Sequence, residues 1–154
     1  MTTEHTQAML PEPLSGKGFT VEERPLTALE AVPLYAAAGW TDMVQDEKAV
    51  ERALANSLYT VCVLHNGHVV ACARIVGDGG INFYIQDVIV LPALQGCGLG
   101  RVVFEACCRY LDKNAPVGAF VGLMAAAGAA GFYERYGFQV RTPDRPGMDR
   151  LWHT

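Results

Sequence analysis

The spacing of hydrophobic and polar positions changes several times along the chain, and each change marks a predicted element. Residues 19–23 alternate as a short strand does, and apolar side chains then recur at nearly helical spacing over residues 26–38, up to Gly39. A second run of helical spacing covers residues 46–55. The first third of the chain therefore predicts a strand followed by two helices.

The middle of the chain changes to the pattern of strands. Residues 57–64 and 68–76 are rich in β-branched and apolar side chains, and Asn66-Gly67 between them is a strong signal for a β-hairpin turn. A third run over residues 81–91 ends at a proline. These three runs predict an antiparallel meander.

The last third returns to helices and short strands. Amphipathic spacing predicts a helix over residues 98–113, an apolar run predicts a strand over 118–124, and a further helix is expected over 126–136. Residues 138–141 and 148–152 are expected to form a closing hairpin. The complete order predicts a mixed α/β structure.

Length and composition fit one small domain. The chain has 154 residues, of which 51% are hydrophobic and 18% are charged, so it is long and apolar enough to bury a core. Residues 1–17 are polar and contain Pro11 and Pro13. We expect them to form a flexible arm that precedes a single domain over residues 18–154.

Charge and cysteine content narrow the class of protein. The net charge of −4 gives no basic field for nucleic acid, and no apolar run is long enough to predict a membrane span. The five cysteines are odd in number and include no CxxC pair, which favours reduced thiols, a cytoplasmic location and no metal site. The negative net charge therefore disfavours a nucleic-acid-binding module.

Residues 95–101, Gln-Gly-Cys-Gly-Leu-Gly-Arg, lie between a predicted strand and a predicted helix. Glycines let consecutive backbone N–H groups turn towards one point, and the helix start adds its positive end, so this segment can cradle a pyrophosphate. A tightly packed glycine turn is the alternative. The dinucleotide pattern GxGxxG fails because Arg101 occupies the place of its last glycine, and no Walker motif is present.

The same segment fits [QR]-x-x-G-x-[GA] at Gln95, Gly98 and Gly100, and here the chain resembles the GNAT family of acetyltransferases. The resemblance includes the preceding strand, residues 87–92, and a second motif over residues 131–138, Gly-Phe-Tyr-Glu-Arg-Tyr-Gly-Phe. It covers nearly the whole chain. It implies a GNAT-like acyl-CoA N-acyltransferase fold, with a splayed central mixed sheet flanked by helices.

The resemblance also implies a cofactor and a mechanism. Acetyl-CoA is the expected acyl donor, and an amine attacks its thioester carbonyl. The backbone N–H of Val90 is expected to contact the oxyanion, and Tyr133 to act as general acid for the departing thiolate. The alternative for Tyr133 is that its ring only packs against its neighbours. The expected cofactor-binding residues are Val88, Ile89, Val90, Gln95, Gly96, Cys97, Gly98, Leu99, Gly100, Arg101, Phe132 and Tyr133.

The general base is less well defined by the sequence. Asp87 is a candidate, and a structural carboxylate bonded to a neighbouring loop or helix cap is the alternative. Alternation along a strand predicts that Tyr84, Gln86 and Val88 share one face and that Asp87 points to the other. One position departs from the family pattern. Ala126 stands where many relatives carry an asparagine that contacts the cofactor arm.

The acceptor side is expected near the loop between the first two helices. Tyr35, Trp40 and Asp42, together with Tyr84 and Gln86 on the cofactor strand, are the candidate substrate-binding residues. Alternatively, Trp40 anchors the core and Asp42 caps the second helix. The expected acceptor is a small primary amine, either an arylalkylamine or an amino-sugar-like amine. A protein N-terminus and a polyamine are alternative acceptors. A homodimer is a further expectation.

Two other functions compete with this hypothesis. One is a catalytically silent acyl-CoA sensor or regulatory protein of the same fold, against which the tyrosine of the second motif argues. The other is an acyltransferase with a longer donor or an oxygen acceptor, or one that modifies proteins or peptides.

Overall fold

A computed structural model describes residues 10, 14 and 16–152 of the chain. The chain divides into two compact units, residues 1–123 and residues 124–154. Most of the predicted flexible arm, residues 1–17, lies outside the described residues, although Leu14 is described and is buried. None of the described helices is sufficiently long and apolar to cross a membrane.

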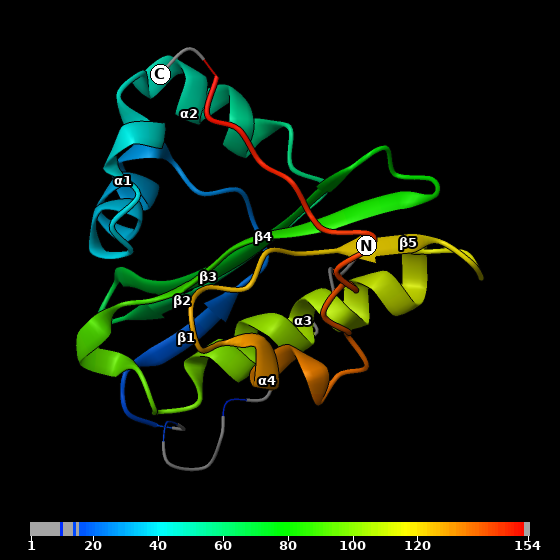
Figure 1. The fold of residues 1–154 in the computed structure, drawn as a ribbon. Coiled ribbons are helices and arrows are strands. Elements are labelled where there is room, and N and C mark those ends of the chain that lie inside the picture. Colours follow the sequence, from blue (N-terminus) through cyan, green and yellow to red (C-terminus); the bar gives the residue numbers. More distant parts are fainter. Residues whose placement is uncertain (1–9, 11–13, 15, 153–154) are drawn as a thin grey trace, which may run out of the picture. The chain divides into compact units, whose positions relative to one another are not determined.

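The first unit contains a five-stranded mixed sheet in the order β1-β2-β3-β4-β5 (Figure 1). The strands are β1 (Phe19–Glu22), β2 (Tyr59–His65), β3 (His68–Gly77), β4 (Asn82–Val90) and β5 (Phe120–Gly122). The first four pair antiparallel, and β5 pairs parallel to β4. The predicted meander is therefore confirmed, and the strand expected over residues 118–124 is only three residues long.

Helices cover both faces of this sheet (Figure 1). On one face lie α1 (Ala28–Ala37) and α2 (Glu47–Ala55), joined through the 3-10 helix η1 (Thr41–Val44). On the other face lies α3 (Leu99–Asn114), which follows the 3-10 helix η2 (Pro92–Leu94). The predicted mixed sheet flanked by helices is confirmed.

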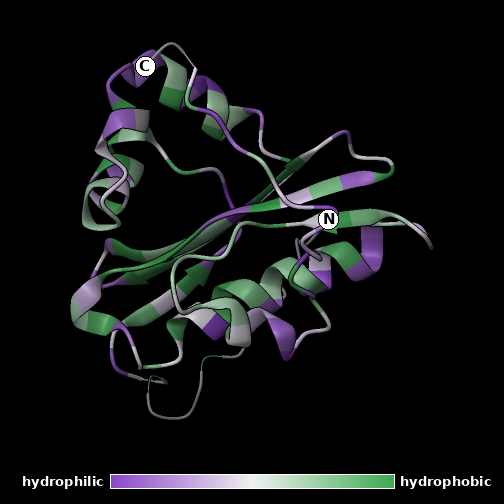
Figure 2. Cartoon of the chain, viewed as in Figure 1, coloured by the Kyte–Doolittle hydropathy of each residue, from purple (hydrophilic) through white to green (hydrophobic). Residues whose placement is uncertain are grey.

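The core lies on both faces of the sheet. Strands β2 and β3 bury nearly all of their central residues, because each of their faces meets a helix. Figure 2 shows α3 with hydrophobic and hydrophilic residues interleaved, as expected for a helix that buries one side. The buried residues of α3 are Leu99, Val102, Val103, Phe104, Ala106 and Cys107.

The second unit contains the short helix α4 (Ala130–Glu134). The predicted helix over residues 126–136 is therefore too long. The predicted closing hairpin is wrong, since no strand occurs in the described residues after Gly122. Both halves of that hairpin are exposed: the exposed fraction is 69% for Val140 and 86% for Met148. No core covers these side chains, so pairing the two halves would bury little apolar surface. Two prolines between the halves also remove backbone donors.

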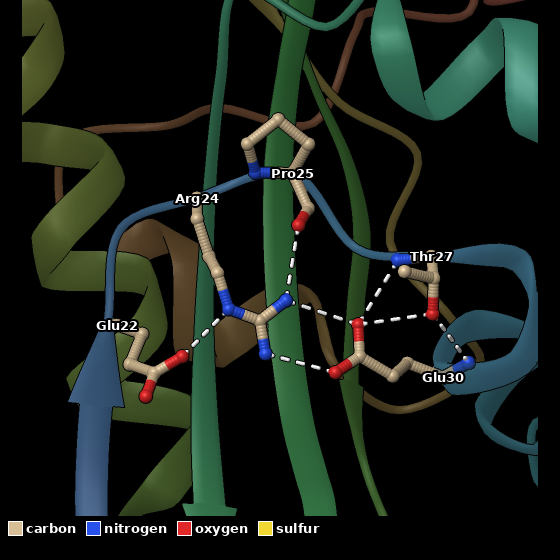
Figure 3. Close-up of polar contacts among 5 residues, drawn as sticks. All are labelled: Glu22, Arg24, Pro25, Thr27 and Glu30. Atoms are coloured by element: carbon tan, nitrogen blue, oxygen red, sulfur yellow. Dashed lines mark hydrogen bonds and ion pairs between the residues drawn. The ribbon is translucent and has the colours of Figure 1, made fainter.

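The start of α1 is fixed by a polar cluster (Figure 3). Thr27 caps the helix and exchanges hydrogen bonds with Glu30 in a capping box. The guanidinium of Arg24 donates to Glu30 at 2.8 and 3.0 Å and to Glu22 at 2.6 Å. The hydrogen bonds from Arg24 are the largest cause that lowers the pKa of Glu30 to about 2.

This cluster gives a prediction for stability. Since the folded-state pKa of Glu30 lies below its ordinary value, its contribution is complete above the ordinary pKa and is lost as the pH falls towards 2. The cluster is partly solvated, so Glu30→Gln should lower the free energy of unfolding by only about 1 kcal/mol at pH 6, with a smaller loss at pH 3. Urea unfolding at both values measures this. Glu51→Gln, an exposed change on α2, is the control, and an equal loss at both pH values would contradict the prediction.

Candidate active site

Strand β4 has an edge that its neighbour covers only in part. Strand β5 pairs with Asn82, Phe83 and Tyr84 and then ends. Over residues 85–90, no other strand in the described part of the chain pairs with this edge. The backbone groups that point there have no partner strand among the described residues, so those without another hydrogen bond can bind a ligand.

Val90 presents its backbone to this open edge. The next residue, Leu91, donates its N–H to the Val70 carbonyl on β3 at 2.9 Å. Backbone groups point alternately to the two edges of a strand, so the N–H and C=O of Val90 point away from β3. Consistent with this, Gln95 Nε2 donates to the Val90 carbonyl at 3.1 Å. The Val90 N–H is thus directed to the open edge, as an oxyanion contact requires.

A β-bulge interrupts β4 at Asp87, within residues 85–90 and three residues before Val90. The pairing with β3 shifts between Cys72 and Arg74, and Asp87 has a φ of 56°, in the left-handed region. One extra residue in β4 therefore reverses the alternation of its side chains.

The bulge overturns the predicted faces of this strand. Asp87 was expected opposite Gln86, but its carboxylate reaches Tyr35 on α1, and Gln86 pairs across from Arg74 on that same face. After the bulge, Ile89 joins the core under α1, which places Val88 on the other face. Gln86 and Val88 thus do not share a face.

The glycine segment follows η2 and leads directly into α3. Gly96 and Gly98 have φ values of 79° and 90°, which side chains rarely adopt, so both positions require glycine for this path. Cys97 between them is exposed. A Cβ at Gly100 would lie 3.7 Å from Val90 Cγ2, so the start of α3 lies close to the open edge of β4.

The first turn of α3 is left without a side-chain cap. Thr27 and Asp46 cap α1 and α2, whereas Gly98 at the start of α3 makes no such hydrogen bond. The first N–H groups of a helix have no partner within it, so this end can bind an anion through its main chain. The Leu99 side chain is buried in the core, and Arg101 Nε donates to Glu105 at 2.8 Å.

The second motif forms an aromatic turn within the second unit. Phe132 and Tyr133 on α4 are half-buried, and their rings meet edge to face with centroids 5.1 Å apart. The ring of Phe138 lies 6.4 Å from that of Tyr133. Gly137, with a φ of 85°, closes the turn.

The predicted acceptor residues are in different environments. Tyr35 is 7% exposed and donates its hydroxyl hydrogen to Asp87 Oδ2 at 2.5 Å. Trp40 packs partly buried against the same core, 6.4 Å from the Tyr35 ring. Tyr35 and Trp40 are thus brought together, largely as core residues.

The remaining acceptor candidates are more open. Asp42 is exposed in η1, and the cap of α2 is Asp46. Tyr84 and Gln86 are half-buried on β4. These two are the members of the predicted set that lie on the cofactor strand.

Sequence reasoning missed the partners of Asp87. Arg74 lies in the middle of β3 and forms an ion pair with the Asp87 carboxylate, with side-chain exposures of 12% and 2%. Burial lowers the pKa of Arg74, but the adjacent carboxylate outweighs this, so the pKa is raised overall. An arginine within the apolar run of residues 69–76 was the available signal, because a charge there requires a buried partner.

Comparison with known proteins finds similarity to acetyltransferases. The model of the acetyltransferase (GNAT) domain matches residues 56–140. Serotonin N-acetyltransferase 2, chloroplastic, of Oryza sativa subsp. japonica is 34% identical over 88% of this chain and 68% of that protein. GCN5-related N-acetyltransferase 1, chloroplastic, of Arabidopsis thaliana is 34% identical over 86% of this chain and 67% of that protein. The matches thus span about two thirds of these relatives.

A solved structure agrees in fold over most of the chain. It is that of a protein from meticillin-resistant Staphylococcus aureus described as a "probable acetyltransferase". The TM-score is 0.80 and the sequence identity 28%, over 87% of this chain and 99% of that one.

Proposed function

Because the chain belongs to the GNAT family of acetyltransferases and is an acyltransferase, we propose that it transfers an acetyl group from acetyl-CoA to the primary amine of a small molecule by direct attack in a ternary complex. The observation that carries this proposal is the open edge of β4 beside the uncapped start of α3. The two features bring backbone groups without a described partner strand next to a helix start that can bind an anion, and the two ends of an acyl-CoA would require both.

Main-chain groups would hold the donor. The N–H groups of residues 95–101 contact the pyrophosphate, with Gly96 and Gly98 permitting the turn. Val88, Ile89 and Val90 contact the pantetheine arm, and Gln95 keeps the loop tied to β4 through the Val90 carbonyl.

The chemistry follows from a few groups of this chain. Acetyl-CoA supplies the acetyl group as a thioester. As the amine nitrogen bonds to the carbonyl carbon, the Val90 N–H stabilises the charge that develops on oxygen. Tyr133 donates a proton to the sulfur as the C–S bond breaks, and the excess proton of the nitrogen leaves to a base or to water. Phe132 packs beside Tyr133 and keeps its ring in place.

For the acceptor we propose an arylalkylamine. The plant relative named a serotonin N-acetyltransferase supports this choice by its name, and the half-buried aromatic rings of Trp40 and Tyr84 support it by their chemistry. Amino sugars and peptide N-termini are the competing acceptors. The cytoplasmic location and the homodimer stay predictions, and both plant relatives carry the word chloroplastic in their names.

The proposed function is tested by product formation from a panel of amines. The protein is incubated with acetyl-CoA and serotonin, tryptamine, glucosamine or a short peptide, and the acetylated amine is quantified by mass spectrometry. We expect kcat/KM for the arylalkylamines to exceed that for glucosamine by about 100-fold, since a buried aromatic ring contributes about 3 kcal/mol. Binding of acetyl-CoA without any acetylated product would favour the sensor, and equal rates with the peptide would contradict the choice of acceptor.

A further inference from the structure

Three side chains from two elements converge on Asp87 in the β4 bulge. Tyr35 Oη on α1 donates to Asp87 Oδ2 at 2.5 Å, and Arg74 Nε on β3 donates to the same oxygen. Cys72 on β3 donates its thiol hydrogen to the Asp87 backbone carbonyl at 3.3 Å. We refer to Tyr35, Cys72, Arg74 and Asp87 as the bulge clamp.

The bulge clamp is buried and reaches a third element. Arg74 Nη1 also contacts Ser57 Oγ at 3.3 Å and the Ala53 carbonyl at 3.4 Å, at the end of α2. Removing a charged pair from water costs several kcal/mol, so an apolar pair of similar volume would often be as stable. This suggests that the pair serves to fix a particular geometry, rather than to add stability.

The geometry in question is the backbone of the bulge. Asp87 has a left-handed backbone conformation, with a φ of 56°, and its backbone carbonyl accepts a hydrogen bond from the Cys72 thiol. Such a conformation persists where the surroundings hold it in place. The clamp holds Asp87 through both its side chain and its backbone. Three residues later in the chain, Val90 directs its N–H to the open edge.

We propose that the bulge clamp is a positioning device, which fixes the direction of the Val90 N–H by holding the bulge, and that Asp87 acts through the backbone rather than as the base. This inference rests on the proposed function, in which Val90 contacts the acyl oxygen. Asp87 Oδ2 already accepts hydrogen bonds from Tyr35 and Arg74, and Asp87 Oδ1 is buried from solvent. An amine therefore cannot reach either oxygen in this arrangement.

Tyr35→Phe tests the clamp because it removes one hydroxyl and leaves the ring. Tyr59→Phe is a matched control, since it also removes one hydroxyl from a tyrosine, but from a half-buried ring on β2 that stacks on Tyr110 of α3, away from the bulge. Two readouts are used: the backbone amide NMR signals of residues 88–90 in the free protein, and kcat together with the Kd for acetyl-CoA.

Tyr35→Phe is expected to shift the amide signals of residues 88–90 and to lower kcat about tenfold, because a small misplacement of a reacting group is costly. Its Kd should change less than kcat does, because the pyrophosphate contacts lie elsewhere, at residues 95–101. Tyr59→Phe should leave the amide signals and kcat as in the wild type. Unchanged amide signals and kcat in Tyr35→Phe would overturn the proposal.

Asp87→Asn separates positioning from base catalysis, because asparagine tolerates the left-handed region and keeps the volume. The clamp predicts a lower kcat with an unchanged shape of the pH–rate profile. Loss of the acidic limb of that profile would show that Asp87 is the base and overturn the proposal. If the wild type transfers no acetyl group, the proposed function fails, and the amide signals still decide whether the clamp holds the bulge.

Discussion

Gly98→Asp is expected to weaken acetyl-CoA binding strongly while the protein stays folded. Gly98 begins α3 with a φ of 90°, in the path that leads the main chain around the proposed pyrophosphate site. A side chain in this region costs about 1–2 kcal/mol of backbone strain. The carboxylate adds like-charge repulsion at the very place where the uncapped N–H groups would meet the phosphates. Together these effects should lower the affinity at least about 100-fold, or about 2.7 kcal/mol.

Isothermal titration with acetyl-CoA measures this loss. Gly98→Ala introduces the strain without the charge, and it should retain more affinity than the aspartate variant. Gly118→Asp adds the same charge at another glycine with positive φ and open space, outside the loop, and should bind as the wild type does. A Gly98→Asp protein that binds acetyl-CoA normally would contradict the anion site at the start of α3.

Tyr133→Phe is expected to lower kcat about 100-fold, since general acid catalysis contributes about 10²- to 10⁴-fold. The thiolate would then depart without a positioned proton donor. The ring contacts with Phe132 and Phe138 are kept by phenylalanine, so the fold of the aromatic turn should not change. The Kd for acetyl-CoA should stay within about twofold, because a proton transferred during bond cleavage contributes little to binding.

Steady-state kinetics with saturating acetyl-CoA provide the measurement. Tyr136→Phe is the matched control: it lies in the same segment, its ring also contacts Phe132, and it should retain the wild-type kcat. A Tyr133→Phe protein with a kcat within threefold of the wild type would leave Tyr133 with a packing role only.

Much of the fold was predictable because local patterns agree with the final structure. The Asn66-Gly67 turn separates β2 from β3 as predicted, and Asn66 has the positive φ that such turns use. The glycine segment before α3 was also predictable, because the spacing of its glycines indicates the backbone path that leads into the helix. These features depend on residues that are adjacent in the chain, so they can be predicted from a single sequence.

Features that depend on distant contacts were not predictable. The β4 bulge lies where Asp87 contacts Tyr35, a residue 52 positions earlier in the chain. No local pattern in the sequence indicates an extra residue in a strand. The alternation rule therefore failed from Asp87 onward. The predicted closing hairpin failed for the opposite reason: a local alternation around Val140 exists, but no buried surface supports it.

The exposure of Cys97 has a practical consequence for labelling. Of the five free thiols, Cys62, Cys72 and Cys107 are buried, Cys108 is partly covered and Cys97 is exposed. A maleimide dye should therefore attach first at Cys97 without any engineered cysteine, and it would sit inside the glycine segment. The unmodified protein thus carries its own attachment point for a fluorescent reporter of ligand occupancy, at a position where a bulky dye could itself compete with the ligand.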